Sequence, residues 1–350
     1  MGGRVLIVGG GIIGLSIAWR ARQRGLEPLV LEAGRDGAGW HRAAGMLAPV
    51  TEAEFGEEDL LRLGIESARR YAGFCAELGV ELRGAGTLVV ARDRDEAEAL
   101  DRLHAFRATL GLSAERLRPS AARRREPALA QTVRLALDVP GDRAVDPRAL
   151  VAALRARVEV RDARVLELLP GEGVRLEGGE VVRGEQVVLA AGAWSAELDA
   201  RVPVRPVRGQ VLRLSGEALV ERSIRTLDAY LVPRGDGRYV LGATMEERGW
   251  DPVPTAGGVF ELLRDLSEVL PGVLELHLDE VLVGFRPMTP DSRPAIGRGP
   301  GDILWATGHG RNGILLAPVT ADLVAAQLAG EALPDWARPF DPARFEAVPA

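Results

Sequence analysis

Three glycines near the start of the chain have the spacing of a phosphate-binding turn. Gly9, Gly11 and Gly14 form G-x-G-x-x-G directly after the apolar run 5–8. In such a turn the first glycine permits a tight bend, the second lets the backbone approach a pyrophosphate, and the third lets the next helix pack closely. A helix starting near Ile12 would direct its N-terminal N–H groups at the phosphates. The pattern therefore predicts a dinucleotide-binding site.

An acidic residue ends the next expected strand. Glu32 follows the apolar segment 28–31, where a carboxylate can accept hydrogen bonds from both hydroxyls of an adenosine ribose. The same carboxylate would repel a 2′-phosphate, so NADP is disfavoured. The order of strand, glycines, helix, strand and acid is more specific than the glycines alone, but it fits both FAD and NAD. A nicotinamide dehydrogenase therefore stays open on these residues.

Composition excludes several other classes of site. The 350 residues carry a net charge of −6, and all 44 basic residues other than His are Arg, so the Schiff-base and P-loop lysines are excluded. One cysteine, Cys75, excludes an intramolecular disulfide and a cysteine zinc site, and four scattered histidines predict no metal site. We expect no nucleic-acid partner, because acidic residues outnumber basic ones. The glycine-interrupted segment 5–19 is too short to span a membrane, so a cytoplasmic protein without a membrane partner is expected.

Hydrophobic periodicity predicts the elements that position these residues. Helices are expected at 12–24, 57–79, 94–110, 147–156, 257–269 and 314–328. Strands are expected at 5–8, 28–31, 87–91, 163–169, 174–177, 180–183, 186–195, 204–214, 224–233, 238–244, 276–283 and 303–307. The segment after 333 is expected to be extended at the surface. This order predicts an α/β protein whose Rossmann-like domain has a parallel sheet, joined to an α+β domain with a mostly antiparallel sheet.

Several stretches together resemble the FAD-dependent D-amino-acid oxidase family, specifically its bacterial glycine oxidase branch of thiamine-pathway type. They are the glycine turn 8–14 with Glu32, the segment 43–47, and the segments 229–234, 242–245, 284–287 and 308–318. The resemblance covers nearly the whole chain. It implies a discontinuous FAD-binding domain of residues 1–50, 140–203 and 285–345, and a substrate-binding domain of residues 51–139 and 204–284.

The resemblance also implies a reaction. Glycine, sarcosine or a small D-amino acid would pass a hydride to flavin N5 and become an imine, which hydrolyses to a 2-oxo acid. Dioxygen would reoxidise the flavin and form hydrogen peroxide, and glycine imine could supply thiazole synthesis in the thiamine pathway. The expected partners are the amino acid, dioxygen and further copies of the chain in a homo-oligomer. Two alternatives remain: a D-amino-acid dehydrogenase that uses a quinone, and a flavin-binding subunit without independent activity.

Three residues are implied as catalytic. A guanidinium is a planar two-pronged donor for a carboxylate, and the resemblance assigns this role to Arg286. Tyr230 would add a hydroxyl, although a core aromatic residue explains it equally well. Arg311 resembles a second arginine that contacts substrate, and Met245 and Ala48 would line the pocket.

The remaining implied residues hold the cofactor. Non-covalent FAD is expected to contact Gly9, Gly11, Ile12, Ile13, Gly14, Glu32, Ala33, Ala44, Gly45, Met46, Val165, Gly192, His309, Gly310, Arg311, Asn312, Gly313 and Ile314. A helix N-terminus at 310–314 would place partial positive charge at the flavin N1–C2 edge. Cys75 lies outside every flavin-matching stretch, which argues against a covalent link. Because a neutral amine needs no general base, turnover is expected to rise toward alkaline pH.

Overall fold

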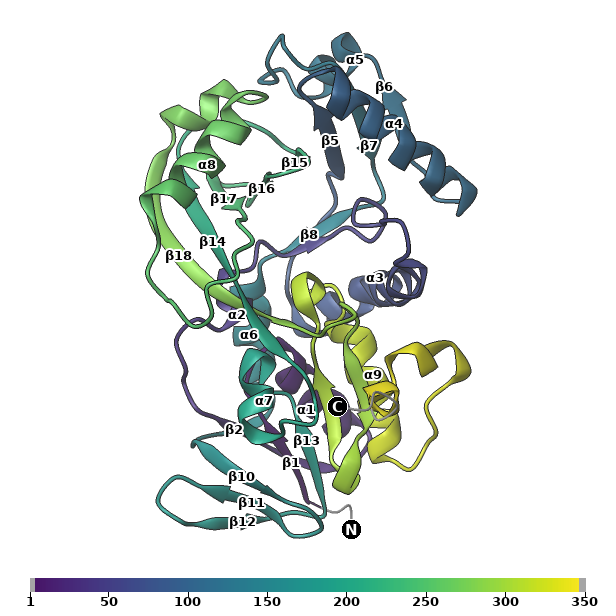
Figure 1. The fold of residues 1–350 in the computed structure, drawn as a ribbon, viewed down its shortest axis with the longest axis vertical. Coiled ribbons are helices and arrows are strands. Elements are labelled where there is room, and N and C mark those ends of the chain that lie inside the picture. The colour runs from purple at the N-terminus through teal and green to yellow at the C-terminus, as the bar shows by residue number, and fades with distance from the viewer. Residues whose placement is uncertain (1–3, 346–350) are drawn as a thin grey trace.

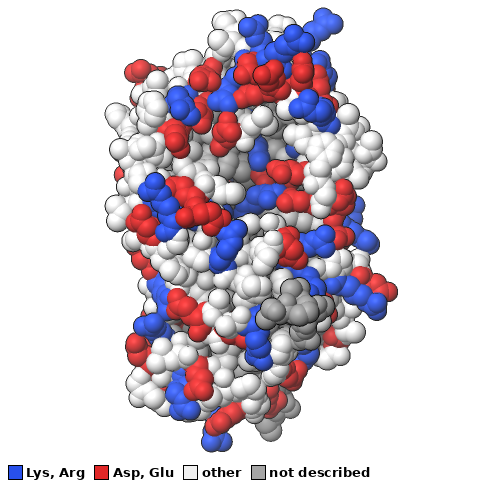
Figure 2. All heavy atoms as spheres, in the orientation of Figure 1, with Lys and Arg blue, Asp and Glu red and all other residues white. Residues whose placement is uncertain are grey.

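Two large sheets lie at opposite ends of an elongated molecule (Figure 1). The computed structural model describes residues 4–345. Short elements and long strands connect the two ends. No helix in this part of the chain is long and apolar enough to cross a bilayer. On the face drawn in Figure 2, acidic and basic side chains are interspersed.

The six-stranded sheet contains the glycine turn. Its order is β19-β20-β13-β1-β2-β9, and only β19 runs antiparallel to its neighbour. The strands are β1 (Arg4–Val8), β2 (Glu27–Glu32), β9 (Glu159–Asp162), β13 (Gln186–Leu189), β19 (Ala295–Arg298) and β20 (Leu304–Thr307). The central position of β1 explains its continuous apolar run, because both of its faces are covered.

Helices cover one face of this sheet and a small sheet covers the other. Val5 and Ile7 pack in the same core as α1 (Ile12–Gln23), α6 (Pro147–Arg155) and α9 (Ala317–Leu328). Leu6 and Val8 point the other way, toward β10 (Val165–Leu169), β11 (Gly173–Leu176) and β12 (Val181–Arg183). Alternate residues of β1 therefore belong to two cores, as strand geometry requires.

The eight-stranded sheet is antiparallel apart from the β15–β5 pair, in the order β18-β14-β17-β16-β15-β5-β7-β6. Its strands are β5 (Thr87–Ala91), β6 (Glu115–Leu117), β7 (Leu135–Val139), β14 (Arg205–Ser215), β15 (Ser223–Arg225), β16 (Tyr230–Pro233), β17 (Arg238–Gly242) and β18 (His277–Met288). Helices α5 (Pro119–Arg125) and α8 (Ala256–Ser267) contribute to the core on one face, and α4 (Arg94–Thr109) packs on the other. The expected fold class is confirmed.

A smaller group of elements lies between the two large sheets. The strands β3 (Met46–Leu47), β4 (Leu82–Arg83) and β8 (Arg143–Val145) form a three-stranded sheet, and α2 (Gly39–Arg42) and α3 (Glu58–Leu78) are helical. Helix α7 (Ser195–Leu198) instead packs on β10, beside the six-stranded sheet. Helix α3 begins with acidic residues and ends at Gly79, whose φ of 69° is left-handed. Acidic residues favour a helix N-terminus and glycine readily adopts the left-handed ending.

Several details differ from the sequence-based expectations. The apolar run 224–233 is a hairpin, because Thr226 closes a turn by donating its N–H to the carbonyl of Ala229 at 2.8 Å. The last long helix begins at Ala317 instead of 314, after a separate 3-10 turn at Gly310–Asn312. The expected strand 186–195 ends at Leu189 and is followed by a 3-10 helix at Gly192–Trp194. The short strands β3, β4, β6, β7, β8 and β19 and the polar strand β9 were not expected. Residues 335–345 are not extended: 335–340 is a 3-10 helix that buries Phe340, and 342–345 is another; residues 346–350 lie outside the described chain.

Candidate active site

A cavity of about 1160 Å³ extends from the carboxyl ends of β1 and β2 to the eight-stranded sheet. Gly9 and Glu32 line it from the six-stranded sheet, and Tyr230 and Arg286 line it from β16 and β18. Ligands in open α/β sheets bind outside the carboxyl ends of the strands, so the cavity has the expected position. Residues predicted to bind the cofactor and residues predicted to bind the substrate therefore line the same cavity.

The three glycines of the turn have distinct structural roles. Gly9 has a φ of 113°, and a Cβ there would lie 2.4 Å from the carbonyl oxygen of Ala190. A Cβ on Gly14 would lie 2.0 Å from the carbonyl oxygen of Gly9. At Gly11 a Cβ would meet only Trp40, at 3.5 Å, and Gly11 lines the cavity. Two glycines thus permit the packing, and the middle one presents bare backbone to a ligand, which fits a bound pyrophosphate.

Glu32 is positioned by backbone donors on either side of it. Its carboxylate accepts a hydrogen bond from the N–H of Gly10 and another from the N–H of Gly34, at 2.7 Å. These contacts hold the carboxylate at the end of β2, beside the glycine turn. The arrangement fits recognition of a ribose by this residue.

The structure brings the predicted cofactor residues together around the cavity, apart from Gly14, which lies beneath the turn. The cavity is lined by Gly9, Gly11, Ile12, Ile13, Glu32, Ala33, Ala44, Gly45, Met46, Val165, Gly192, His309, Gly310, Arg311, Asn312, Gly313 and Ile314. Their contacts with a cofactor remain a prediction.

His309 anchors the segment that follows β20. Its Nε2 lies 3.0 Å from Oγ1 of Thr320 on α9, and burial lowers its pKa to about 3. The imidazole is therefore neutral at physiological pH. Beyond it, the 3-10 turn Gly310–Asn312 faces the cavity where a helix start was expected. The N–H groups at this site consequently belong to a short turn before α9.

Arg286 presents its guanidinium without a carboxylate partner. Its Nη1 donates to the carbonyl oxygens of Thr244, at 3.0 Å, and Arg208, at 3.3 Å. Among residues 4–345, no carboxylate forms an ion pair with it within 4.0 Å. Burial lowers its pKa, and the nearby Tyr230 opposes that shift. A partly buried guanidinium that faces a cavity and has no carboxylate partner is suited to bind an anion.

Tyr230 lies close to this cation. Burial raises the pKa of its phenol, whereas the charges of Arg286 and Arg225 lower it. A Cβ on Gly242, opposite Tyr230 in the β16–β17 pair, would lie 2.5 Å from the phenol oxygen. The glycine therefore leaves room for the hydroxyl. Tyr230 lines the cavity, and its contribution to substrate binding remains a prediction.

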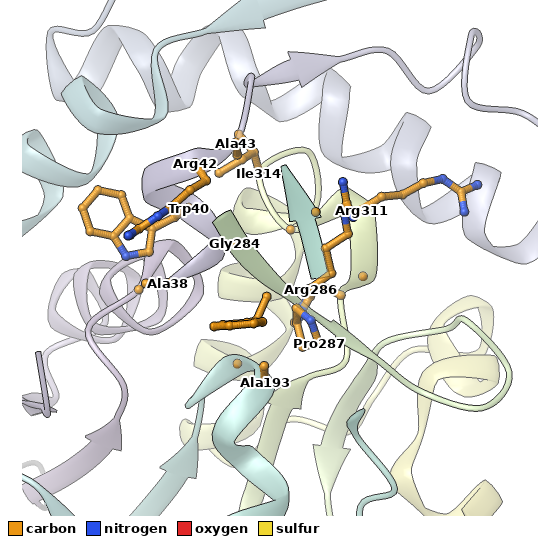
Figure 3. Close-up of a pocket in the computed structure, with 18 of the residues that line it drawn as sticks. Ala38, Trp40, Arg42, Ala43, Ala193, Gly284, Arg286, Pro287, Arg311 and Ile314 are labelled. Carbon is orange, nitrogen blue, oxygen red and sulfur yellow. The ribbon is translucent and has the colours of Figure 1, made fainter. Parts of the chain in front are cut away.

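Arg311 also lines the cavity, but two carboxylates hold it. Its Nε lies 2.8 Å from Oε2 of Glu52 and its Nη2 lies 2.5 Å from Oε2 of Glu57. Figure 3 shows Arg286 and Arg311 on the side of the pocket opposite Trp40, with the Arg311 side chain extending away from Arg286. The two arginines that the sequence singled out thus have different electrostatic environments.

Two charged residues of the site were missed by the sequence reasoning. Arg225 ends β15 and forms an ion pair with Glu52, and both line the cavity. In an expected strand 224–233, Arg225 had no distinguishing signal, and Glu52 follows the matched segment 43–47 without being part of it. Only their proximity in the folded chain identifies Arg225 and Glu52 as residues of the site.

The predicted pocket residues Met245 and Ala48 both line the cavity, in contrasting environments. Ala48 is buried, whereas Met245 is 65% exposed. Trp250, in the same loop as Met245, stacks on Trp194 with ring centroids 5.3 Å apart. This stacking attaches the loop after β17 to the short 3-10 helix beside the six-stranded sheet.

A family model described as DAO, FAD dependent oxidoreductase, matches residues 4–327. The chain belongs to this family of FAD-dependent oxidoreductases. FAD is therefore the cofactor, and the choice that the glycine turn left open is resolved against NAD.

Individual proteins support the same placement. The chain is 32% identical to glycine oxidase from Bacillus licheniformis, over 98% of each chain. It is 37% identical to the putative thiamine biosynthesis oxidoreductase ThiO of Rhizobium etli, over 94% of this chain and 97% of that one. The crystal structure of glycine oxidase from Geobacillus kaustophilus superposes with a TM-score of 0.91 at 30% identity, covering 98% of this chain and 99% of that chain.

Proposed function

We propose that the protein oxidises glycine or another small amino acid, such as sarcosine or a small D-amino acid. The amino acid, dioxygen and water would yield a 2-oxo acid, ammonia or an amine, and hydrogen peroxide. The observation that carries the proposal is Arg286: its partly buried guanidinium has backbone carbonyls, and no ion-paired carboxylate, as partners within the described chain. It lines the same cavity as the cofactor-binding turn.

The chain's own residues would bind and orient the substrate. Arg286 binds the substrate carboxylate through two N–H groups, which fixes how the amino acid lies in the cavity. Tyr230 adds its phenol next to the same carboxylate. When bound, FAD supplies the acceptor for the hydride that leaves the α-carbon. A substrate whose amine is already neutral needs no side chain to remove a proton, so we assign no general base.

The relatives support the acceptor and the metabolic role. Those from Bacillus licheniformis and Geobacillus kaustophilus are oxidases of glycine by name, which favours dioxygen over a quinone. The relative named for thiamine biosynthesis favours glycine imine as a product with a biosynthetic use. We place this activity in the cytoplasm and expect a homo-oligomer.

We also propose that residues 1–50, 140–203 and 285–345 form the FAD-binding domain, and that 51–139 and 204–284 form the substrate-binding domain. FAD is held without a covalent bond in this proposal, because Cys75 is buried in α3, outside the described lining of the cavity. Acid precipitation should therefore leave the yellow colour in the supernatant.

An anaerobic screen of the purified holoenzyme tests the substrate assignment. Glycine, sarcosine and both alanine enantiomers are mixed with the protein, and loss of the flavin absorbance is recorded. Bleaching by at least one small amino acid, followed by peroxide on admission of air, is the expected result. Bleaching without peroxide would indicate a quinone-linked dehydrogenase. No bleaching by any amino acid would indicate a flavin-binding subunit.

A further inference from the structure

Four charged side chains form a continuous chain of ion pairs that starts at the wall of the cavity. Glu52, Arg225 and Arg311 line the cavity, and Glu57 lies behind Arg311, outside the cavity lining. The carboxylate of Glu52 binds Arg225 through Oε1 and Nε of Arg311 through Oε2, the latter at 2.8 Å. Arg311 then continues to Glu57. Two guanidinium groups and two carboxylates sum to zero net charge, and Glu52 is the member that joins both arginines.

Other contacts fix this arrangement in place. Glu52 lies in a turn in which its own N–H donates to the carbonyl of Ala48 at 2.9 Å. The neighbouring Thr51 carbonyl accepts from Nη2 of Arg107 at 2.6 Å, and the Thr51 hydroxyl donates to Asp142. Arg225 lies in β15, where its backbone is opposite that of Tyr230 in the neighbouring strand β16. The backbone that carries Glu52 and the backbone that carries Arg225 are therefore both held by other contacts.

The charges lie within electrostatic reach of the proposed carboxylate site. Tyr230 feels both Arg225 and Arg286, and Arg286 in turn feels Arg311. Of the three arginines Arg225, Arg286 and Arg311, Arg286 is the one without an ion-paired carboxylate among residues 4–345. With Glu52 in place, Arg225 and Arg311 are both ion-paired, and Arg286 is left to bind an anion, with the charge of Glu246 acting on it from farther away. If Glu52 carried no charge, Arg225 would have no carboxylate partner and Arg311 would keep only Glu57.

We infer that Glu52 determines substrate specificity by neutralising Arg225 and Arg311, so that the cavity accepts an amino acid with one carboxylate and excludes a second acidic group. This inference rests on the proposed function. The physical reason is that a buried anion is stable only where a cation is free to pair with it. Replacing Glu52 with a neutral residue frees Arg225 and creates a second carboxylate site. Glu52 is then a positioning residue that acts through the two arginines.

Equilibrium binding to the holoenzyme tests this without any turnover. Acetate and malonate, with one and two carboxylates, are titrated while the visible absorbance of the bound flavin is followed. Wild-type protein should bind acetate at least about 10-fold more tightly than malonate. In Glu52→Gln the ratio should shift toward malonate by at least about 10-fold, and the double variant Glu52→Gln/Arg225→Gln should reverse that shift. Glu58→Gln removes the same charge at an exposed position six residues away and should leave the ratio unchanged.

Each outcome decides between the two proposals. If acetate does not perturb the wild-type flavin, the carboxylate site is wrong and both proposals fail. If acetate binds but Glu52→Gln leaves the ratio unchanged, the inference on Glu52 alone is overturned. Should Glu52→Gln fail to retain FAD, Arg225→Gln decides: it leaves the group with a net negative charge and should weaken acetate binding several-fold. Unchanged acetate binding in that variant would overturn the inference.

Discussion

Gly209 leaves the space that the guanidinium of Arg286 occupies. A Cβ at position 209 would lie 2.4 Å from Nη1 and 2.7 Å from Cζ of Arg286. The two residues lie on neighbouring strands, β14 and β18, whose register places Gly209 opposite Gly284 and Arg286 opposite Val207. The absence of a side chain at 209 therefore determines where the proposed carboxylate-binding group lies.

Gly209→Ala should displace the Arg286 guanidinium without unfolding the protein, because the clash is with the far end of a flexible side chain. A misplacement of about 1 Å can cost about 100-fold in rate, so kcat/KM for glycine should fall by about 10- to 100-fold. Steady-state kinetics and the thermal midpoint are measured together. Gly73→Ala is the control, since a Cβ there meets nothing within 4 Å on an exposed part of α3. Unchanged kinetics in Gly209→Ala would contradict this relationship.

Arg286→Ala should weaken substrate capture while leaving FAD bound. Removing one partner of a buried charge pair costs about 2–5 kcal/mol, which corresponds to about 30-fold or more in kcat/KM. Arg286→Lys should recover only part of this loss, because an ammonium lacks the planar two-pronged geometry. The flavin spectrum of each variant reports cofactor retention. Arg94→Ala, at an 89% exposed side chain, serves as the control. Normal glycine affinity in Arg286→Ala would exclude its assigned role.

Substitutions within the glycine turn should separate cofactor binding from folding. In Gly11→Ala the added methyl group has room within the protein, so the variant should fold normally. It should bind FAD more weakly, because the methyl group lies where the backbone must approach the pyrophosphate. Gly14→Ala should instead lower the yield of folded protein, because its Cβ would lie 2.0 Å from a carbonyl oxygen. Thermal unfolding and FAD titration of the apoprotein distinguish the two effects. Equal FAD affinity in wild type and Gly11→Ala would contradict the predicted contact.

Asp142 should make stability depend on pH. Burial raises its pKa from 3.8 to about 6, so the folded protein holds this proton more tightly than the unfolded chain does. Its stabilising contribution is complete below pH 3.8 and is lost as the pH rises through about 6. The loss amounts to about 3 kcal/mol at most.

Asp142→Asn should remove this loss. Urea unfolding at pH 4.5 and 7.5 gives the change in unfolding free energy, which should be smaller toward high pH in the variant than in wild type. Asp335→Asn, at an 86% exposed side chain, should follow the wild-type profile. Parallel profiles for Asp142→Asn and wild type would show that Asp142 does not titrate in this range.

Turnover should rise from neutral toward alkaline pH. The reacting form of the substrate has a neutral amine, and its population grows with pH. His309 lines the cavity, but its pKa of about 3 keeps it uncharged throughout this range, so it adds no titration near neutrality. The pH profile of kcat/KM for glycine measures this. An optimum at acidic pH would show that a protein group must be protonated for the reaction.

The sequence by itself determined the features that lie within short stretches of chain. Gly9, Gly11, Gly14 and Glu32 belong to one strand–helix–strand unit, whose geometry follows from local spacing. Arg286 was identified because the residues around it resemble a known family. Short-range pattern and motif therefore sufficed for the cofactor turn, the fold class and the proposed anion-binding arginine.

Only the tertiary structure decided how the charges of the site are compensated. Glu52 and Arg225 are 173 residues apart, and Glu52 and Arg311 are 259 apart, so no local spacing connects them. The space for Arg286 likewise depends on the register between β14 and β18. Packing of the whole chain selects the strand register, because a shift of one residue would turn each side chain to the other face of the sheet. The same packing brings the distant segments together that form the ion pairs.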